Sequence, residues 1–265
     1  MNPLLLPLVA AQAAYVNRTI GKEPRPEGPT KGFVTAPEAE DGSSPLRLLV
    51  IGDSSASGRG APTHDLAFAG SMARAIAKRS ERSVEWRALG KYGATSERIR
   101  HGILTKVTGE WDLAVLLVGV NDILARRSVE AWTRDLTAIV ETLQEHAAHT
   151  VLPGIPEFGA FPSLPRTLRR YLAERGTALD VAARLVCAGR TSVQWVSSAD
   201  LGPAEPSFFA ADGFHASPAG YERWAQAICD HLDLSLGTTS CASGTWCWPA
   251  WVSRSRSEPC ETGRG

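Results

Sequence analysis

The chain has 265 residues, which is enough for one sizeable α/β domain or two small ones. Hydrophobic residues make up 43% and charged residues 21%, a composition that excludes an intrinsically disordered chain. Lys plus Arg and Asp plus Glu number 28 each, so no basic excess indicates nucleic acid, and we expect no nucleic-acid partner.

An apolar stretch, PLLLPLVAAQAAYV, covers 3–16 and is short for a membrane span. It could be the hydrophobic region of a signal peptide with a cleavage site near 11–13, but no Lys or Arg precedes it. We favour an uncleaved helix that packs on the domain or makes peripheral contact with a membrane. This favours a bacterial-type cytoplasmic or membrane-associated protein over a secreted one. Pro, Gly and charged residues dominate 17–45, which predicts a linker or an irregular arm.

Strands and helices alternate from residue 46 onward. Short segments rich in β-forming residues predict strands at 46–51, 84–89, 113–118, 150–155 and 192–196, of which 113–118 is a continuous apolar run. Helical spacing of apolar residues predicts helices at 67–78, 96–105, 129–148, 168–188 and 218–232, with Ser217 as the cap of the last. Five strands that alternate with helices predict a parallel sheet covered on both faces. We therefore expect a flavodoxin-like three-layer α/β/α sandwich with strand order 2-1-3-4-5.

The last part of the chain, 236–265, has no periodicity and predicts an irregular C-terminal extension. It holds three of the five cysteines, without the C-x-x-C spacing of a zinc site. The other two, Cys187 and Cys229, lie in predicted helices and indicate small core residues. The chain thus divides into an N-terminal segment (1–45), a domain (46–235) and this extension, and its oligomeric state is open.

Polar residues and glycines follow the predicted strands at places that should meet. Ser54 follows the first strand, Gly93 the second and Asn121 the third, while Asp212 and His215 lie in the loop before the last helix. The carboxyl ends of parallel strands share one rim, where ligands bind. Taken singly, each residue also fits a structural role in a turn, a helix cap or a solvated loop.

Taken together, these residues predict nucleophilic catalysis. A serine nucleophile needs a base within hydrogen-bond reach, and the base needs an acceptor on its other nitrogen. The spacing of Asp212 and His215 lets the carboxylate reach imidazole Nδ1 and leaves Nε2 free for Ser54. The backbone N–H groups of Ser54 and Gly93 and the side-chain amide of Asn121 could stabilise an oxyanion.

The sequence blocks around these residues resemble those of the SGNH hydrolase superfamily, also called GDSL esterases/lipases. In the order of that family they are Gly-Asp-Ser at 52–54, Gly93, Gly-Val-Asn-Asp at 119–122 and Asp-Gly-Phe-His at 212–215. The resemblance covers about 46–235. Ser55 departs from it, because many members have Leu or another apolar residue there.

The resemblance implies a role for each of five residues and a flavodoxin-like fold. Ser54 would be the nucleophile, His215 the base and Asp212 its acid partner. Ser54, Gly93 and Asn121 would form the oxyanion hole. The implied reaction is a two-step acyl transfer through an acyl-enzyme that needs no metal and no organic cofactor.

We also predict the roles of three charged residues near these blocks. We expect Asp53 to bond to the backbone or to helix ends, and not to be the triad acid. Asp122 should cap the following helix or buttress its loop, and Arg59 should be solvated rather than bound to a substrate charge.

We expect aromatic residues near the rim to build the substrate pocket: Tyr92, Phe158, Phe161, Phe209 and Phe214, with Leu164 and Phe208 adding apolar area. At least half of the phenylalanines should instead fill the core. The remainder suit an acyl chain or an aromatic alcohol. No large lid insertion is evident, which favours a short-chain or aryl ester over a long-chain lipid.

Other functions remain open at this point. A lysophospholipase or thioesterase and a carbohydrate acetyl esterase would use the same machinery on different esters. A catalytically silent binding module could use the same rim, although the intact set of polar residues argues against it. A nucleotide-binding protein is disfavoured, because neither G-x-G-x-x-G nor a Walker lysine follows the first strand.

Overall fold

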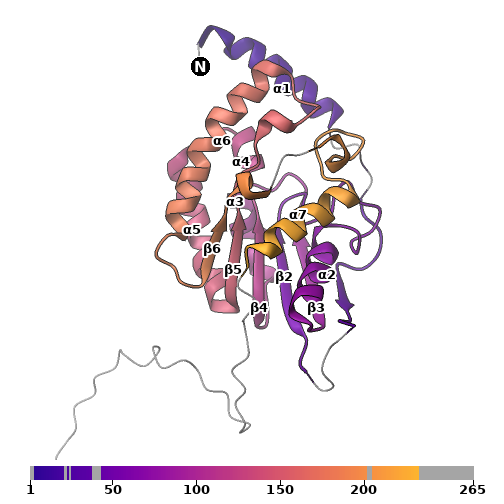
Figure 1. Cartoon of the computed structure of the whole chain (residues 1–265). Helices are drawn as coiled ribbons and strands as arrows, with labels where there is room; N and C mark the ends of the chain where they lie inside the picture. The colour runs from indigo at the N-terminus through magenta and orange to yellow at the C-terminus, as the bar shows by residue number, and fades with distance from the viewer. Residues whose placement is uncertain (1–2, 21–22, 24, 38–42, 202–204, 233–265) are drawn as a thin grey trace, which may run out of the picture. The chain divides into compact units, whose positions relative to one another are not determined.

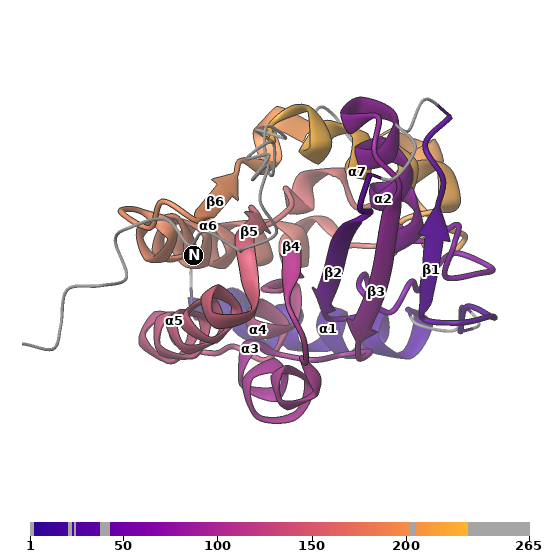
Figure 2. The same cartoon turned by 90° about the horizontal axis from the view of Figure 1, so that it is seen from below.

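A computed structural model of the chain describes residues 3–20, 23, 25–37, 43–201 and 205–232. Within this part of the chain, a six-stranded sheet lies between two layers of helices (Figures 1 and 2). The predicted C-terminal extension at 236–265 lies outside the described residues. The predicted boundaries of the three segments stay predictions.

The strands are β1 (Lys31–Val34), β2 (Leu46–Gly52), β3 (Val84–Gly90), β4 (Trp111–Leu117), β5 (Ala147–Pro153) and β6 (Val193–Val196). Their order is β1-β3-β2-β4-β5-β6, and every pair from β3 to β6 is parallel. The five predicted strands therefore exist in the predicted order 2-1-3-4-5. The expected α/β/α class is confirmed.

Strand β1 corrects the prediction of five strands to six. It lies in the segment predicted as a linker or irregular arm and pairs antiparallel with the edge of β3. A Cβ atom on Gly32 would come within 2.6 Å of the Trp86 ring, so only glycine lets this strand close over the indole. The strand is four residues long and only half-buried on one side, which leaves little apolar pattern in the sequence.

The helices are α1 (Leu6–Thr19), α2 (Phe68–Ser80), α3 (Ser96–Arg98), α4 (Val120–Leu124), α5 (Val129–His146), α6 (Arg166–Cys187) and α7 (Pro218–Asp230). Single 3₁₀ turns cover Pro3–Leu5, Leu104–Lys106, Phe158–Ala160, Ser198–Leu201 and Pro206–Phe208. Helices α2 and α7 cover one face of the sheet, while α1, α3, α4 and α5 lie on the other (Figure 2). Ser217 caps α7 as predicted, because its Oγ accepts a hydrogen bond from Gly220 N–H.

The helix predicted at 96–105 is irregular. It begins as the single turn α3, continues as a π-helical segment (Ile99–Ile103) and ends in a 3₁₀ turn. Helix α5 ends at His146, two residues before the predicted end, and β5 begins directly after it. These differences leave the order of the elements unchanged.

The core has two apolar layers, one on each face of the sheet. In β2, Leu48 and Val50 point toward α2 and α7, whereas Leu49 and Ile51 point toward the opposite layer. All four side chains are buried. Burial on both faces explains the unbroken apolar run, and it places the residues after Gly52 at the rim.

The predicted N-terminal helix exists and packs on the domain as α1. Val9 and Val16 join the apolar layer that contains α6, and Gln12 Oε1 accepts a hydrogen bond of 2.9 Å from Leu168 N–H. Leucines are exposed at the start of α1 and in the 3₁₀ turn before it: Leu4, Leu5, Leu6 and Leu8. Peripheral membrane contact through this end stays a prediction.

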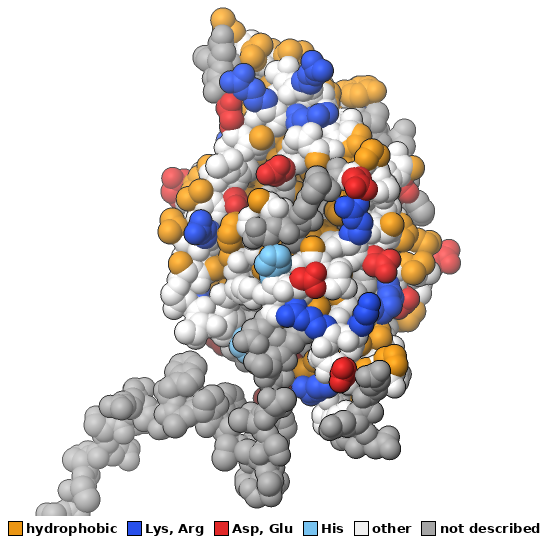
Figure 3. All heavy atoms as spheres, in the orientation of Figure 1, with side chains coloured by type: hydrophobic (Ala, Val, Ile, Leu, Met, Phe, Trp, Pro, Cys, Tyr) orange, Lys and Arg blue, Asp and Glu red, His pale blue; other side chains and the backbone are white. Residues whose placement is uncertain are grey.

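No helix among the described residues combines the length and the apolar character needed to cross a membrane. Both signs of charge are interspersed on the face shown in Figure 3.

Candidate active site

The turn after β2 is held tightly against β4. A Cβ atom on Gly52 would lie 2.0 Å from the carbonyl oxygen of Leu117, so a glycine is required at this close approach. Asp53 N–H donates to the same carbonyl at 3.0 Å. Ser54 follows directly and is buried beneath the rim. The two strands therefore fix the position of the Ser54 hydroxyl.

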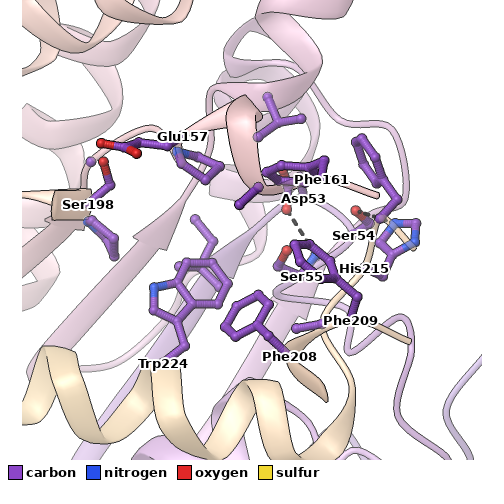
Figure 4. Close-up of a pocket in the computed structure, with 18 of the residues that line it drawn as sticks. Asp53, Ser54, Ser55, Glu157, Phe161, Ser198, Phe208, Phe209, His215 and Trp224 are labelled. Carbon is purple, nitrogen blue, oxygen red and sulfur yellow. Dashed lines mark hydrogen bonds between the residues drawn. The ribbon is translucent and has the colours of Figure 1, made fainter. Parts of the chain in front are cut away.

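The structure brings Ser54, His215 and Asp212 together, as the sequence predicted. Figure 4 shows the contact between Ser54 and His215. His215 Nε2 lies 3.2 Å from Ser54 Oγ, and His215 Nδ1 lies 2.6 Å from Asp212 Oδ2. Asp212 Oδ1 accepts hydrogen bonds of 2.9 Å from the N–H groups of Phe214 and His215. One carboxylate thus shapes the turn with one oxygen and orients the imidazole with the other.

The electrostatics keep the Asp212 carboxyl group ionised. Burial by itself would raise its pKa, but the hydrogen bonds from His215 and Phe214 and the nearby imidazole outweigh that effect and lower the pKa below its ordinary value. An ionised carboxylate holds the imidazole with its proton on Nδ1, which leaves Nε2 as an acceptor facing Ser54.

Two backbone N–H groups in the turns after β2 and β3, those of Ser54 and Gly93, are available as donors. Among the described residues, neither Ser54 N–H nor Gly93 N–H donates to another protein group. Gly93 has a φ of 68°, and a Cβ atom there would meet no atom within 4 Å, so the space beside it is open. The third predicted donor, Asn121 Nδ2, already faces two acceptors: Ala94 O at 3.1 Å and Asp53 Oδ2 at 3.3 Å.

Asp53 is a buried carboxyl group that borders the nucleophile. Its Oδ1 accepts a 2.9 Å hydrogen bond from Ser55 N–H, so it bonds to the backbone as expected. Burial raises its pKa to about 6, and the Asp122 carboxylate adds to the rise, while the Ser55 N–H group and His215 oppose it.

The raised pKa makes stability depend on pH. Stability from this group is fully present below its unfolded pKa of about 3.9 and is lost as the pH rises through its folded pKa of about 6. The rise of about two pH units corresponds to about 3 kcal/mol. Asparagine does not titrate, so the free energy of unfolding of Asp53→Asn minus that of the wild type should increase by about this amount between about pH 4 and pH 7. Urea denaturation across that range measures the difference, and a difference that does not change with pH would contradict the assignment.

Asp122 ties the loop that carries Gly93 to the helix that carries Asn121. It accepts hydrogen bonds from Ser96 N–H at 2.9 Å and Ser96 Oγ at 2.6 Å, and its Oδ1 lies 3.1 Å from Arg127 Nε. The expected buttress is therefore present. The alternative of a cap on the following helix is wrong, because Ser128 Oγ and not Asp122 accepts the cap hydrogen bond of α5, from Ala131 N–H at 3.2 Å.

A cavity of about 470 Å³ opens beside Ser54 (Figure 4). Of the predicted pocket residues, Phe161, Phe209 and Phe214 line it, as does Phe208. Trp224, which was not among the predicted pocket residues, also lines the cavity. The helical spacing of Tyr221, Trp224 and Ile228 could have placed it on the inner face of α7. Glu157 and Ser198 lie at the end of the cavity away from Ser54 (Figure 4).

Three of the expected pocket assignments are corrected. Phe158 and Leu164 are buried in the core, because the 3₁₀ turn at Phe158–Ala160 directs Phe158 inward. Tyr92 does not line the cavity; its ring lies 6.0 Å from that of His215.

The expectation of a solvated Arg59 is also corrected. Its guanidinium lies 4.5 Å from the centre of the Tyr92 ring and donates a hydrogen bond to Glu23 O.

Residues 50–223 match the sequence model of the GDSL-like lipase/acylhydrolase family. The chain belongs to this family. The match runs from β2 into α7 and so includes all five residues that the structure gathers at the rim. The family makes this GDSL-like hydrolase a carboxylic ester hydrolase that acts on small-molecule esters.

Relatives of this GDSL-like hydrolase include a mycobacterial esterase and two solved structures with the same fold. The GDSL-like esterase Rv1075c of Mycobacterium tuberculosis is 26% identical over 218 residues, which cover 76% of this chain and 68% of that protein. A lipase/acylhydrolase from Enterococcus faecalis is 22% identical with a TM-score of 0.52, over 70% of this chain and 94% of that one. An acetyl xylan esterase from Geobacillus stearothermophilus is 17% identical with a TM-score of 0.50, over 73% and 95%.

Proposed function

We propose that this GDSL-like hydrolase cleaves short-chain or aryl carboxylic esters through a Ser54–His215–Asp212 triad and an acyl-enzyme. One observation carries the proposal: an unbroken chain of contacts from Ser54 Oγ through the imidazole to the Asp212 carboxylate, at the mouth of an apolar cavity. This is the arrangement that serine acyl transfer requires.

In the first step, His215 Nε2 takes the proton of Ser54 as Oγ attacks the ester carbonyl carbon. Ser54 N–H, Gly93 N–H and the Asn121 amide stabilise the oxyanion that forms. The intermediate collapses to the acyl-enzyme, and His215 gives its proton to the departing alcohol. Water then attacks the acyl group while His215 takes its proton, and the carboxylic acid leaves as the proton returns to Ser54.

The cavity favours an apolar group of modest size. Phe161, Phe208 and Phe209 form its walls. The centroid of the Phe209 ring lies 5.3 Å from that of Phe161 and 5.2 Å from that of Phe208. Such walls suit an aryl or short alkyl group better than a hydroxyl-rich sugar. A carbohydrate acetyl esterase, the activity named for one structural relative, is therefore the weaker candidate.

A series of p-nitrophenyl esters from acetyl to hexadecanoyl tests the proposal, measured as kcat/KM on the full chain. We expect the maximum at octanoyl or shorter. A maximum at dodecanoyl or longer would favour lipid-derived esters instead. Lysophosphatidylcholine, acyl-CoA and acetylated xylan complete the panel, and faster turnover of one of these than of any aryl ester would replace the proposed substrate class.

A further inference from the structure

Asp53 has no part in the triad, although it borders the nucleophile. Its carboxylate joins two elements: Oδ1 accepts from Ser55 N–H within its own turn, and Oδ2 lies 3.3 Å from Asn121 Nδ2 at the start of α4. The side chain is buried, so water does not compete freely for either oxygen. Asp53 therefore links the turn that carries the nucleophile to a residue proposed for the oxyanion hole.

The orientation of the Asn121 amide decides whether it can stabilise an anion. An amide presents a donor at Nδ2 and an acceptor at Oδ1, and a half-turn of the group exchanges the two. Here Asp53 Oδ2 and Ala94 O are both acceptors, at 3.3 Å and 3.1 Å from Nδ2. The turned amide would bring its own oxygen against both of them, so the observed orientation is strongly preferred.

The backbone and the side chain of this part of α4 are held by different carboxylates. Asp122 binds Ser96 on the neighbouring loop and so fixes the start of the helix. That contact does not touch the Asn121 amide, whose own bonds are to Asp53 and Ala94. Of these two partners only Asp53 is a side chain, and thus only it can be changed by substitution.

We propose that Asp53 is a positioning residue, which orients the Asn121 amide so that its NH₂ group rather than its oxygen faces the oxyanion formed on attack by Ser54. The inference rests on the proposed function. It explains why a buried carboxylate is placed here, where an uncharged residue could close the turn without the cost of burying a charge. In the transition state, one Asn121 N–H bond shifts toward the oxyanion while the other stays with its present acceptor.

A double-mutant cycle on the full chain tests this inference, using Asp53→Asn, Asn121→Ala and the double variant with a p-nitrophenyl ester. Asparagine keeps the size of Asp53, and its side-chain oxygen can still accept from Ser55 N–H. Its NH₂ group then replaces the carboxylate oxygen that faces Asn121 Nδ2, so a donor stands where an acceptor was. We expect Asn121→Ala to lower kcat by about 10²–10³-fold, as loss of an oxyanion donor does. Asp53→Asn should lower kcat by about tenfold or more with KM within about threefold of wild type, because the orientation matters in the transition state.

The decisive quantity is the effect of Asp53→Asn in the Asn121→Ala background. We expect kcat of the double variant within about threefold of Asn121→Ala alone, since nothing remains to be oriented. Asp112→Asn is the matched control, because Asp112 also accepts a backbone N–H group, that of Arg47 at 2.7 Å, at the other end of the sheet. The small effect of Asp112→Asn on kcat should be the same in the wild type and in Asn121→Ala.

Two results would overturn the inference. If Asp53→Asn lowers kcat by the same factor in both backgrounds, Asp53 acts without Asn121, while the proposed triad stands. If Asn121→Ala retains wild-type kcat, Asn121 is no oxyanion donor and the inference fails with it. The fall in kcat of Ser54→Ala is measured separately and tests the proposed function alone. Should Asp53→Asn not fold, as judged by circular dichroism, Asp53→Ala serves in the same cycle.

Discussion

Replacing Ser54 with alanine is expected to lower kcat for ester hydrolysis by about 10⁴–10⁶-fold. The reason is geometric: Ser54 Oγ is the group at 3.2 Å from His215 Nε2, and alanine removes the atom that would bond to the acyl carbon. The donors at Gly93 and Asn121 would remain, so some rate above that of water should persist through oxyanion stabilisation alone. The fold should be retained, because the contacts of Asp53 N–H and Arg59 N–H in this turn are made by the backbone.

Covalent labelling with a fluorophosphonate probe, located by mass spectrometry, tests the assignment of Ser54 as the nucleophile without a substrate. The wild type should carry the label on Ser54, and Ser54→Ala should carry none. Ser71→Ala is the matched control, because Ser71 is a buried serine on α2 that lies outside the site. Wild-type hydrolysis or labelling in purified Ser54→Ala would remove Ser54 as the nucleophile. A wild type that does not react with the probe would instead favour a catalytically silent binding module.

The sequence predicted the central strands β2 and β4 because most of their residues are buried on both faces and thus read as apolar runs. Leu48 and Leu49 point to opposite layers, which explains why the positions from Leu48 to Ile51 are all apolar. Strand β1 carries no such pattern. Its fit depends on Gly32 lying over the ring of Trp86, a contact between residues far apart in the chain. Edge strands of this kind are fixed by tertiary packing and leave little local signal.

The rim residues were predictable for a related reason. Ser54, Gly93 and Asn121 each follow a buried strand, and parallel strands bring their carboxyl ends to one edge. The spacing of Asp212 and His215 then fits a single turn in which the carboxylate bonds to both N–H groups and imidazole. Local chemistry and topology were sufficient here.

The pocket walls were harder to predict, because they depend on the direction of single side chains in irregular segments. Phe158 and Phe161 are three residues apart in one loop, yet the first faces the core and the second the cavity. Both are phenylalanines, with ring centroids 5.4 Å apart, so hydrophobicity alone does not distinguish their positions. Trp224 was missed because it lies on a helix, whereas the prediction considered loops.

No pattern in the sequence predicted the charged cluster beside the loop that carries Gly93. Arg127 is its centre: its Nε faces Asp122 Oδ1, Nη1 donates to Glu97 at 2.6 Å, and Nη2 donates to Asp135. Arg100 adds a second cation at 2.9 Å from Asp135. These residues come from several elements and have no regular spacing, so only the folded chain shows that they meet.

Arg127→Met should therefore lower the free energy of unfolding by about 3–5 kcal/mol, the range expected when one partner of a buried ionic network is removed. Methionine keeps the apolar stem but leaves the carboxylate of Asp122, which is fully buried, without its cation; Asp135, with 1% of its side chain exposed, would keep only Arg100 and Arg134. Burial already raises the pKa of Asp122, and loss of the cation would raise it further.

Urea denaturation of the full chain measures this loss, with Arg170→Met as the control. Arg170 pairs with Glu174 on the exposed side of α6, and 76% of its side chain is accessible, so its removal should cost less than about 0.5 kcal/mol. Because Asp122 also holds Ser96 on the loop of Gly93, the Arg127 variant should lose kcat as well, even at temperatures where it stays folded. Equal losses of stability in the two variants would show that the buried cluster contributes no more than a surface ion pair. In that case Asp122 holds the loop that carries Gly93 through its hydrogen bonds with Ser96, without a contribution from Arg127.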